Sequence, residues 1–376
     1  MRVLMTGGGT GGHVNPALAI ANTIRAHHPD AEIAFVGTSR GLENKLVPAA
    51  GYPLYHVQIR GFQRKLTLSN FKTLYYAVTS PAKAKRIIRE FKPDIVIGTG
   101  GYVCWPIMKA ASQMGVPTAL HESNALPGVA VKMLQSAVDR IFLNFRETEA
   151  LIRAKKKTMH VGNPLREGFS VADKAEARRA LGIPENARMI LSFGGSLGAQ
   201  NVNRAILELM QDYLNDHEDV YCVHATGASA YKEYREQFEE AGLDQLPNLR
   251  MVEYLYDMPL QMAAADVVIG RAGAMTVSEL AMMGKCAILI PSPNVTDNHQ
   301  YKNAKVLADK GAAVLIEEKD LGDGALLKAV VRLIGDNAER QRMAAAIHSF
   351  AVSDANERIY RELIRLIEQN PVDNKD

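Results

Sequence analysis

Short apolar segments recur along the chain and alternate with longer stretches in which apolar side chains repeat every three or four residues. This alternation is typical of β-strand–α-helix units that build a parallel sheet. It predicts helices at 16–27 and 106–114, and a helical stretch from 344 to 368. The predicted strands lie at 2–5, 32–36, 54–58, 94–97, 117–120, 140–143, 158–161, 189–193, 220–224, 249–253, 266–269, 287–290 and 313–316.

The same pattern predicts two domains of one type. A glycine-rich turn follows the strand at 2–5, a similar turn follows the strand at 189–193, and each leads into an amphipathic helix. Gly162-Asn163-Pro164 comes after a predicted strand and is typical of a linker. We therefore expect an α/β fold of two Rossmann-like, doubly wound parallel-sheet domains facing a central cleft. The expected bounds are 1–162, 163–343, and a helical segment 344–376 that packs back on the first domain.

Composition supports this picture. The chain has 376 residues, of which 47% are hydrophobic and 23% charged, as in soluble globular proteins of about two domains. No apolar run approaches the roughly 18 residues of a membrane-spanning helix. We expect no signal peptide, because glycines interrupt the N-terminal apolar run at once. The three cysteines are far apart, so neither a disulfide framework nor a zinc site is indicated, and a reducing cytoplasm is expected.

Charge separates the two predicted domains. Residues 1–162 carry 21 Lys+Arg against 9 Asp+Glu, whereas the rest of the chain carries 23 against 32. A basic domain indicates an anionic partner, which could be a nucleic acid, a phosphorylated substrate or a membrane surface.

The strongest basic stretch runs from Asn44 to Arg89 and contains nine bases and no acid. Apolar and aromatic side chains repeat within it at helical spacing. Core packing explains part of this repeat, and a basic amphipathic segment rich in aromatics also indicates a membrane-surface patch. No nucleic-acid-binding motif accompanies the charge, which disfavours that partner. The predicted membrane patch comprises Arg64, Lys65, Phe71, Lys72, Tyr75 and Lys83.

The first glycine turn, Gly7–Gly12, satisfies the GxGxxG pattern of dinucleotide-binding proteins, which hold phosphate on backbone N–H groups at a helix N-terminus. The second predicted strand ends at Val36 without the acidic residue that such proteins use for the ribose, so the motif is weak support for NAD. A turn required only for packing is the alternative. His13, which opens the next helix, could be a cap, a solvent-exposed residue or a general base.

Two more glycine turns follow predicted strands. One is Gly98–Gly101, followed by Tyr102. The other, Gly194–Gly198, contains Ser196 in a GxSxG pattern, for which Asp297 and His299 could nominally complete a hydrolytic triad. Because the first turn has Thr10 in place of the serine, we favour a repeated phosphate-binding turn over a nucleophile.

Thr276 and Glu279 follow the predicted strand at 266–269. Their spacing fits a capping box, with Thr276 as the N-cap and Glu279 at the third helical position. The alternative is functional: Thr276 joins helix N–H groups around a phosphate, and Glu279 accepts hydrogen bonds from ribose hydroxyls. Asn298-His299-Gln300 offers amides suited to sugar hydroxyls, although on its own it is an ordinary polar loop.

Seven segments together resemble the MurG family of peptidoglycan glycosyltransferases, which belongs to glycosyltransferase family 28. In chain order they are GGTGGHVNPALA, GTGGYV, HESN, GNPLR, FGGSLGAQ, RAGAMTVSE and DNHQYKNA. The resemblance runs in register from the first strand to about Leu315, and the last 60 residues add little to it. It implies the two-domain GT-B fold.

The resemblance also implies which residues form the site. His13 is the candidate general base, and Gly100, Gly101 and Tyr102 would contact the acceptor pyrophosphate. Leu255 stands where the family often has isoleucine, a change that a backbone contact to uracil would tolerate. The implied donor-binding residues are Thr10, Gly11, Gly12, Asn124, Arg166, Ser196, Leu255, Ala274, Met275, Thr276, Val277, Ser278, Glu279 and Gln300.

The implied reaction is an inverting transfer of N-acetylglucosamine from UDP-N-acetylglucosamine to undecaprenyl-pyrophosphoryl-N-acetylmuramyl-pentapeptide, during peptidoglycan synthesis. The implied location is peripheral, on the cytoplasmic face of the bacterial membrane. No DxD triplet occurs in the sequence, and we expect neither a metal ion nor another cofactor in the donor site. Helix-end N–H groups and hydroxyls would stabilise the departing UDP instead.

Three alternatives come from other classes. A related GT-B enzyme could glycosylate another lipid such as diacylglycerol, although the HESN and GTGGYV segments favour the peptidoglycan acceptor. A sugar-nucleotide epimerase of similar architecture would not need the basic aromatic stretch. A non-catalytic nucleotide-binding module would not need His13 and Glu279.

Overall fold

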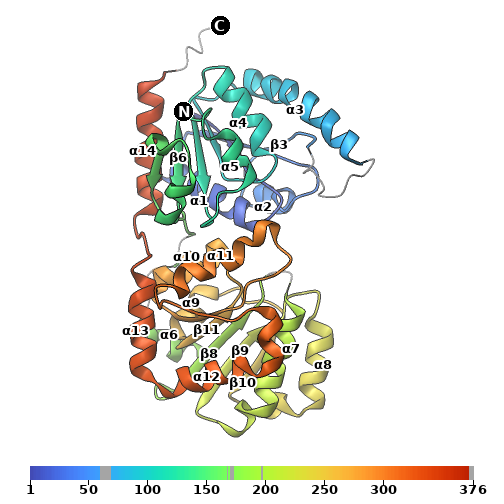
Figure 1. Ribbon diagram of the computed structural model, residues 1–376, viewed down its shortest axis with the longest axis vertical. Helices are drawn as coiled ribbons and strands as arrows, with labels where there is room; N and C mark the ends of the chain where they lie inside the picture. The colour runs from blue at the N-terminus through green and yellow to red at the C-terminus, as the bar shows by residue number, and fades with distance from the viewer. Residues whose placement is uncertain (60–68, 167, 170–172, 196–197, 372–376) are drawn as a thin grey trace. The chain divides into compact units, whose positions relative to one another are not determined.

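The computed structural model describes residues 1–59, 69–166, 168–169, 173–195 and 198–371, with only the backbone of 69–79. The chain forms two compact units (Figure 1). Unit 1 comprises Met1–Arg166 and Val352–Asp376, and unit 2 comprises Glu167–Ala351. Of the helices within the described residues, none combines the length and apolar character needed to cross a membrane.

Unit 1 contains a seven-stranded parallel sheet in the order β3-β2-β1-β4-β5-β6-β7. Its strands are β1 (Arg2–Thr6), β2 (Glu32–Gly37), β3 (Leu54–His56), β4 (Ile95–Gly98), β5 (Thr118–Glu122), β6 (Arg140–Leu143) and β7 (Thr158–His160). Its helices are α1 (Gly11–His27), α2 (Glu43–Ala49), α3 (Ser69–Phe91), α4 (Cys104–Gln113), α5 (Val129–Leu134) and α14 (Ala355–Gln369).

Helices cover both faces of this sheet because its strands are apolar on both sides. Val3 and Met5 pack with residues of α1 and α14 in one core, whereas Leu4, between them, packs with residues of α3 and α4 in another. An ion pair of 2.5 Å between Arg140 and Glu362 also ties α14 to β6.

Unit 2 repeats the plan with six parallel strands in the order β10-β9-β8-β11-β12-β13. The strands are β8 (Arg188–Phe193), β9 (Val220–Ala225), β10 (Leu249–Val252), β11 (Val267–Gly270), β12 (Cys286–Leu289) and β13 (Val314–Leu315). The helices are α6 (Lys174–Leu181), α7 (Gln200–Asp212), α8 (Tyr231–Glu240), α9 (Met258–Ala264), α10 (Ala274–Met283), α11 (His299–Ala308), α12 (Ala325–Gly335) and α13 (Asn337–His348). One core joins Ile190 and Ile269 of the sheet to α7, α8 and α12.

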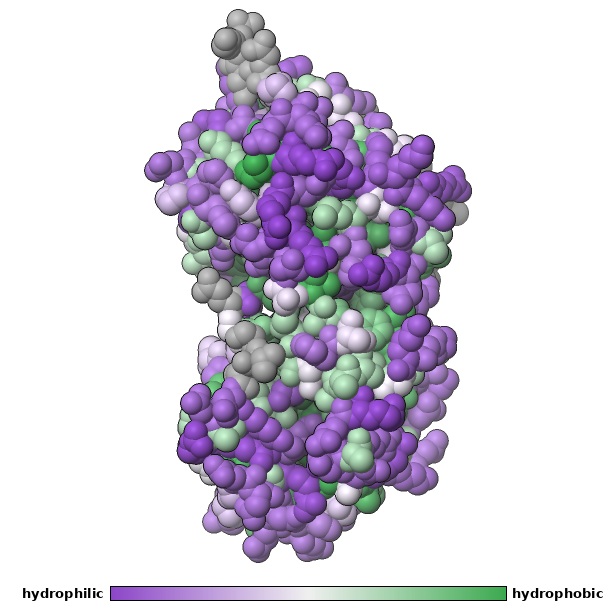
Figure 2. All heavy atoms as spheres, turned by 90° about the vertical axis from the view of Figure 1, so that its left-hand side faces the viewer, coloured by the Kyte–Doolittle hydropathy of each residue, from purple (hydrophilic) through white to green (hydrophobic). Residues whose placement is uncertain are grey.

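All of the predicted strands are present, and the α/β fold of two doubly wound parallel-sheet domains is confirmed. The C-terminal helical pattern is two helices rather than one: α13 ends at His348 in unit 2, and α14 begins at Ala355 in unit 1. Hydrophilic side chains predominate on the face that each unit presents in Figure 2.

Each sheet has a point where the strand order reverses. In unit 1 the chain winds outward from β1 to β2 and β3, then returns to place β4 on the other side of β1. In unit 2 the chain winds outward from β8 to β9 and β10, then returns to place β11 on the other side of β8. Loops that follow such neighbouring strands are the usual ligand-binding positions of doubly wound sheets. The glycine turns predicted from the sequence follow β1, β4 and β8.

Candidate active site

The first glycine turn connects β1 to α1. Gly9 has a φ of +88°, a conformation that favours glycine. The exposed Thr10 is extended, and its carbonyl accepts hydrogen bonds of 3.1 Å from the N–H groups of His13 and Val14. Gly11 and Gly12 therefore form the first turn of α1, where backbone N–H groups have no partner within the helix.

The glycine turn after β4 packs directly against this first turn. Gly100 and Gly101 have φ values of +113° and +84°. A Cβ atom at Gly101 would lie 2.5 Å from the carbonyl oxygen of Gly8, and one at Gly100 would lie 2.3 Å from Nδ1 of His13. Both positions must therefore be glycine for the turns to meet. Tyr102, the next residue, is half exposed.

His13 lies where these two turns meet, and its ring is held in one orientation. Nδ1 lies 3.1 Å from the carbonyl oxygen of Thr99, and the Thr99 hydroxyl donates a 2.7 Å hydrogen bond to the carbonyl of His13. Since a carbonyl oxygen only accepts, Nδ1 carries the proton of the neutral ring. The basic lone pair is therefore on Nε2, as a general base requires.

The end of β5 is a buried polar segment. His121 donates from Nε2 to the carbonyl of Gly162 at 2.9 Å, and burial lowers the pKa of His121 to about 4, so its ring is neutral at pH 7. The Glu122 carboxylate accepts hydrogen bonds from the N–H groups of Asn124 (2.9 Å) and Gly128 (2.7 Å). Burial nevertheless raises the pKa of Glu122. These contacts fix the backbone of Asn124.

Arg166 is exposed and ends the first segment of unit 1. The amide of Asn356, in α14, donates a 3.1 Å hydrogen bond to the carbonyl of Leu165 and so anchors the residue before it.

In unit 2, the segment Ala274–Glu279 forms the first turns of α10. The helix is capped by Gly273, which places Thr276 inside the helix at its third position. The capping-box interpretation of Thr276 and Glu279 is therefore wrong, because the helix begins earlier than that interpretation requires. Ala274 and Val277 are buried, whereas Met275, Thr276, Ser278 and Glu279 are partly exposed.

The backbone before α10 is held by buried polar contacts. Arg271 donates to the carbonyl of Ile290 at 3.1 Å and forms a 2.5 Å ion pair with Glu318. The Asn303 amide donates to the carbonyl of Ala272 at 3.1 Å.

The third glycine turn follows β8 and precedes α7. Ser196 lies outside the described residues, so its predicted role has no structural account here. Around it, Gly195 and Gly198 have φ values of +89° and +76°. A Cβ atom at Gly198 would lie 2.3 Å from the carbonyl oxygen of Thr226, so this position also requires glycine.

The remaining donor-site predictions lie in two other loops of unit 2. Gln300, in the first turn of α11, accepts a 2.9 Å hydrogen bond from the N–H of Ser292. Leu255 is buried after β10, between the exposed rings of Tyr254 and Tyr256.

The hydrolase alternative does not fit these loops. His299 donates from Nδ1 to the carbonyl of Thr296 at 2.8 Å, so that carbonyl, rather than the Asp297 carboxylate, holds the ring nitrogen that a triad acid would contact. Within the described residues, no three His, Cys, Asp or Glu side chains are grouped so that they could hold a metal ion.

Part of the predicted membrane patch can be placed. Arg64 and Lys65 lie outside the described residues, and Phe71, Lys72 and Tyr75 fall in α3 where only the backbone is described. Lys83, further along α3, is partly exposed. Ala84, Ile87 and Ile88 are buried, so core packing accounts for the apolar positions of this last part of the helix.

Glu43, the first residue of α2, is not among the site residues predicted from the sequence. We noted that β2 ends without an acid, yet the Glu43 carboxylate accepts a 2.8 Å hydrogen bond from the N–H of Gly9. The only signal in the sequence was its place as the last acid before the acid-free stretch.

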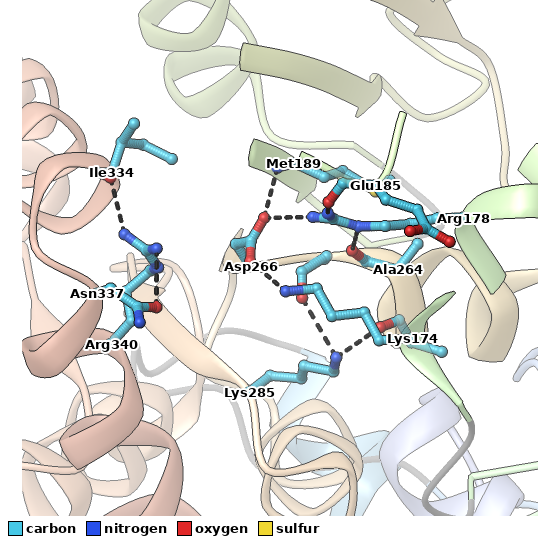
Figure 3. Close-up of polar contacts among 12 residues, drawn as sticks. Lys174, Arg178, Glu185, Met189, Ala264, Asp266, Lys285, Ile334, Asn337 and Arg340 are labelled. Atoms are coloured by element: carbon cyan, nitrogen blue, oxygen red, sulfur yellow. Dashed lines mark hydrogen bonds and ion pairs between the residues drawn. The ribbon is translucent and has the colours of Figure 1, made fainter. Parts of the chain in front are cut away.

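A second polar cluster lies at the opposite end of the unit 2 sheet (Figure 3). Asp266, just before β11, accepts hydrogen bonds from Lys174, from Arg178 at 2.6 Å and from the N–H of Met189 at 2.7 Å. Lys285 donates to the carbonyls of Ala263 (2.7 Å) and Ala265 (3.2 Å). Because Lys285 supplies hydrogen-bond donors to carbonyl groups at the C-terminal end of α9, the cluster has a structural role.

Comparisons with known proteins agree with this architecture. The family model of the glycosyltransferase family 28 N-terminal domain matches residues 3–143, and that of the C-terminal domain matches residues 189–359. A relative from Acetivibrio thermocellus, a UDP-N-acetylglucosamine--N-acetylmuramyl-(pentapeptide) pyrophosphoryl-undecaprenol N-acetylglucosamine transferase, is 43% identical over 98% of this chain and 99% of its own.

Solved structures extend the comparison. The crystal structure of Acinetobacter baumannii MurG superposes with a TM-score of 0.77 and 26% identity, covering 97% of this chain and 99% of that one. A UDP-GlcNAc 2-epimerase from Neisseria meningitidis has a TM-score of 0.65, covers 97% of this chain and 100% of that one, and is only 14% identical, which shows a shared fold alone. The chain therefore belongs to glycosyltransferase family 28 and, within it, to the MurG family of GT-B N-acetylglucosamine transferases.

Proposed function

We propose that the protein transfers N-acetylglucosamine from UDP-N-acetylglucosamine to the C4 hydroxyl of undecaprenyl-pyrophosphoryl-N-acetylmuramyl-pentapeptide, with inversion at the anomeric carbon. The observation that carries this proposal is the 43% identity with a transferase of that name over almost the whole of both chains. The orientation of His13 supports it, because the reaction needs a base for the acceptor hydroxyl.

In the proposed step, the acceptor oxygen forms a bond to the anomeric carbon while the bond from that carbon to the β-phosphate oxygen of UDP breaks. The proton of the attacking hydroxyl passes to Nε2 of His13, whose Nδ1–H remains bonded to Thr99. The hydrogen bond to Thr99 would also stabilise the imidazolium ion, since the carbonyl can accept from Nδ1–H of both the neutral and the protonated ring.

Charge on the departing UDP would be stabilised in unit 2. The N-terminus of α10 presents backbone N–H groups, and Thr276 in its first turn adds a hydroxyl. Glu279, one turn later, would accept hydrogen bonds from the ribose, and Leu255 would contact the uracil through its backbone. Ser196, Gln300, Thr10, Gly11, Gly12, Asn124 and Arg166 remain predicted donor contacts, and no cofactor is proposed.

The acceptor lipid requires the enzyme to work at a membrane. We place the protein peripherally on the cytoplasmic face of the bacterial inner membrane, held by the basic stretch that includes Lys83. Gly100, Gly101 and Tyr102 would contact the acceptor pyrophosphate. The reaction belongs to cell-wall synthesis, on which cell shape and division depend.

Acceptor choice tests this proposal. Purified protein is incubated with UDP-N-acetylglucosamine and, separately, a short-chain muramyl-pentapeptide lipid, diacylglycerol or no acceptor. We expect a glycosylated product only with the first. Glycosylated diacylglycerol would support the related lipid transferase instead, and a 2-epimerised sugar nucleotide without acceptor would support the epimerase.

A further inference from the structure

Glu43 has a fully buried carboxylate in direct contact with the first glycine turn. Its residue is 0% exposed. One carboxylate oxygen accepts a 2.8 Å hydrogen bond from the N–H of Gly9, and the other accepts from the N–H and the hydroxyl of Thr38 at 2.9 Å and 2.8 Å. The group thus connects the start of α2 and the end of β2 to the turn that leads into α1.

Three glycines leave the space that this carboxylate occupies. A Cβ atom at Gly8 would lie 2.6 Å from Oε1 of Glu43, one at Gly41 would lie 1.9 Å from Oε2, and one at Gly37 would lie 2.6 Å from Cγ. Real Cβ atoms do not approach other atoms so closely, so any side chain at these positions would displace the carboxylate. The Glu43 side chain therefore gives a physical reason for glycine at 8, 37 and 41.

The carboxylate is ionised at neutral pH. Burial alone would raise the pKa of Glu43, but the hydrogen bonds from Gly9 and Thr38 outweigh it and lower the pKa below its ordinary value. Among the described residues, no lysine or arginine forms an ion pair with it. Its charge is therefore balanced mainly by N–H and O–H donors, and hydrogen bonds to a charged acceptor are the stronger kind.

The helix that follows this turn supplies no anionic side chain at its own start. The first turn of α1 contains no acidic residue, and the Thr10 side chain makes no capping hydrogen bond. A buried negative charge one residue before Thr10 interacts favourably with the positive end of the helix. Glu43 thus places a negative charge beside the start of α1, while its hydrogen bond holds Gly9, the residue before the N-cap Thr10.

We propose that Glu43 is a positioning residue for the transfer reaction: its carboxylate holds the Gly9 peptide at positive φ and thereby fixes Thr10 and His13. The inference rests on the proposed function, because the position of His13 matters for the reaction only if His13 is the base. His13 is held on its other side by Thr99, so loss of the Gly9 bond leaves the turn anchored at one side only.

Glu43→Gln tests this with Glu362→Gln as the matched control. The amide of the substituted side chain offers one acceptor oxygen in place of two, so either Gly9 or Thr38 loses its acceptor. Glu362 is 7% exposed and also belongs to unit 1, but it pairs with Arg140 and does not touch the turn. Both variants thus lose one buried carboxylate, and only one loses the contact with Gly9.

For Glu43→Gln we expect kcat to fall about tenfold or more, as for a lost charge-assisted hydrogen bond, and the KM for UDP-N-acetylglucosamine to rise by a smaller factor, because Thr10 is one of several predicted donor contacts. Amide hydrogen exchange in residues 7–14 should accelerate in Glu43→Gln but not in Glu362→Gln. Thr38→Val removes the hydrogen bond from the Thr38 hydroxyl but keeps the charge of Glu43, so it should give a smaller loss of kcat. This variant takes the place of Glu43→Gln in the test if Glu43→Gln does not fold.

Unchanged kcat and exchange in Glu43→Gln would overturn the proposal, as would equal losses of kcat in both glutamine variants. Absence of transfer by the unmodified protein would count against the proposed function instead. In that case the exchange measurement still decides whether Glu43 holds the turn.

Discussion

Glu279 shows how far a single residue can be interpreted from sequence. Its spacing from Thr276 fitted both a capping box and a ribose contact, and the structure excludes the first because Gly273 caps the helix. The carboxylate is partly exposed in the second turn of α10, close to a helix N-terminus that follows β11. Its role as a ribose acceptor remains a prediction that a conservative substitution can test.

Glu279→Gln should raise the KM for UDP-N-acetylglucosamine about tenfold or more, since the amide loses a charge-assisted hydrogen bond worth roughly 1.5–3 kcal/mol. Glu233→Gln, on the exposed side of α8, is the control and should leave the KM unchanged. Equal UDP affinity in Glu279→Gln and the unmodified protein, measured by calorimetry, would rule out the ribose contact.

His13→Ala should lower kcat by roughly 10²–10⁴-fold, the usual effect of removing a general base. Donor affinity should change less than kcat, because the proposed role of the ring is to take the proton of the acceptor hydroxyl. Steady-state kinetics together with UDP binding separate the two quantities. If donor affinity falls in parallel with kcat, His13 is a donor ligand and another residue is the base.

Among the elements, strands were the easiest to predict. Buried parallel strands such as β4 and β11 are runs of apolar side chains between an aspartate and a glycine, a pattern with few alternatives. Helix ends were harder, since Gly273 rather than Thr276 is the N-cap of α10. The break between α13 and α14 was not visible, because Phe350, Ala351 and Val352 continue the apolar pattern across it.

The site was predictable to the extent that its backbone is unusual. Positive φ values and close approaches demand glycine, and Gly100, Gly101 and Gly198 therefore marked their turns in the sequence. Contacts between distant side chains leave no such mark. Nothing in the sequence near Glu43 or Thr99 indicated that one holds Gly9 and the other holds His13.

The basic stretch makes a prediction about membrane binding. Changing Arg64, Lys65, Lys72 and Lys83 to Gln should weaken binding to anionic vesicles by several kcal/mol, at about 1 kcal/mol for each charge near the surface. High salt should have the same effect on the unmodified protein. Activity on a water-soluble acceptor analogue should stay nearly normal. That result would show that the donor-binding residues are intact in the variant.

The control for that experiment changes the exposed residues Lys232, Lys302, Lys319 and Lys328 of unit 2 to Gln, which removes the same charge elsewhere. Vesicle sedimentation compares the three proteins. Equal binding by the two quadruple variants would mean that net charge, and not the stretch in unit 1, attracts the protein to the membrane.

At the scale of the whole molecule, the C-terminal helix α14 is part of the first domain, although the second domain separates the two in sequence. It contributes Ile359, Leu363 and Leu366 to the core that contains β1 and α1. Unit 1 is therefore complete only when both chain segments have folded together, and its stability depends on residues from each.

The stability of unit 1 should depend on pH through His121. Its pKa is lowered from 6.5 to about 4 by burial, so the unfolded chain binds a proton between these values and the folded chain does not. Stability from this source is complete above pH 6.5 and is lost as the pH falls toward 4. The loss between pH 7 and 4.5 should be about 2–3 kcal/mol.

Urea unfolding followed by the fluorescence of Trp105, the only tryptophan, reports on unit 1. His121→Gln can keep a hydrogen bond to Gly162 but does not titrate. The free energy of unfolding of this variant should therefore fall less over the same pH range than that of the unmodified protein, by the amount ascribed to His121. Parallel pH dependence in the variant and the unmodified protein would show that other groups cause the loss.

The proposed transfer is tested most directly by the chemical structure of the product that the purified protein forms from UDP-N-acetylglucosamine and a muramyl-pentapeptide lipid. Mass spectrometry and proton NMR give its composition, linkage position and anomeric configuration. We expect one added N-acetylhexosamine on the C4 oxygen of the muramyl sugar, with the configuration opposite to that of the donor. Retained configuration, linkage to another hydroxyl, or release of free N-acetylglucosamine alone would contradict it.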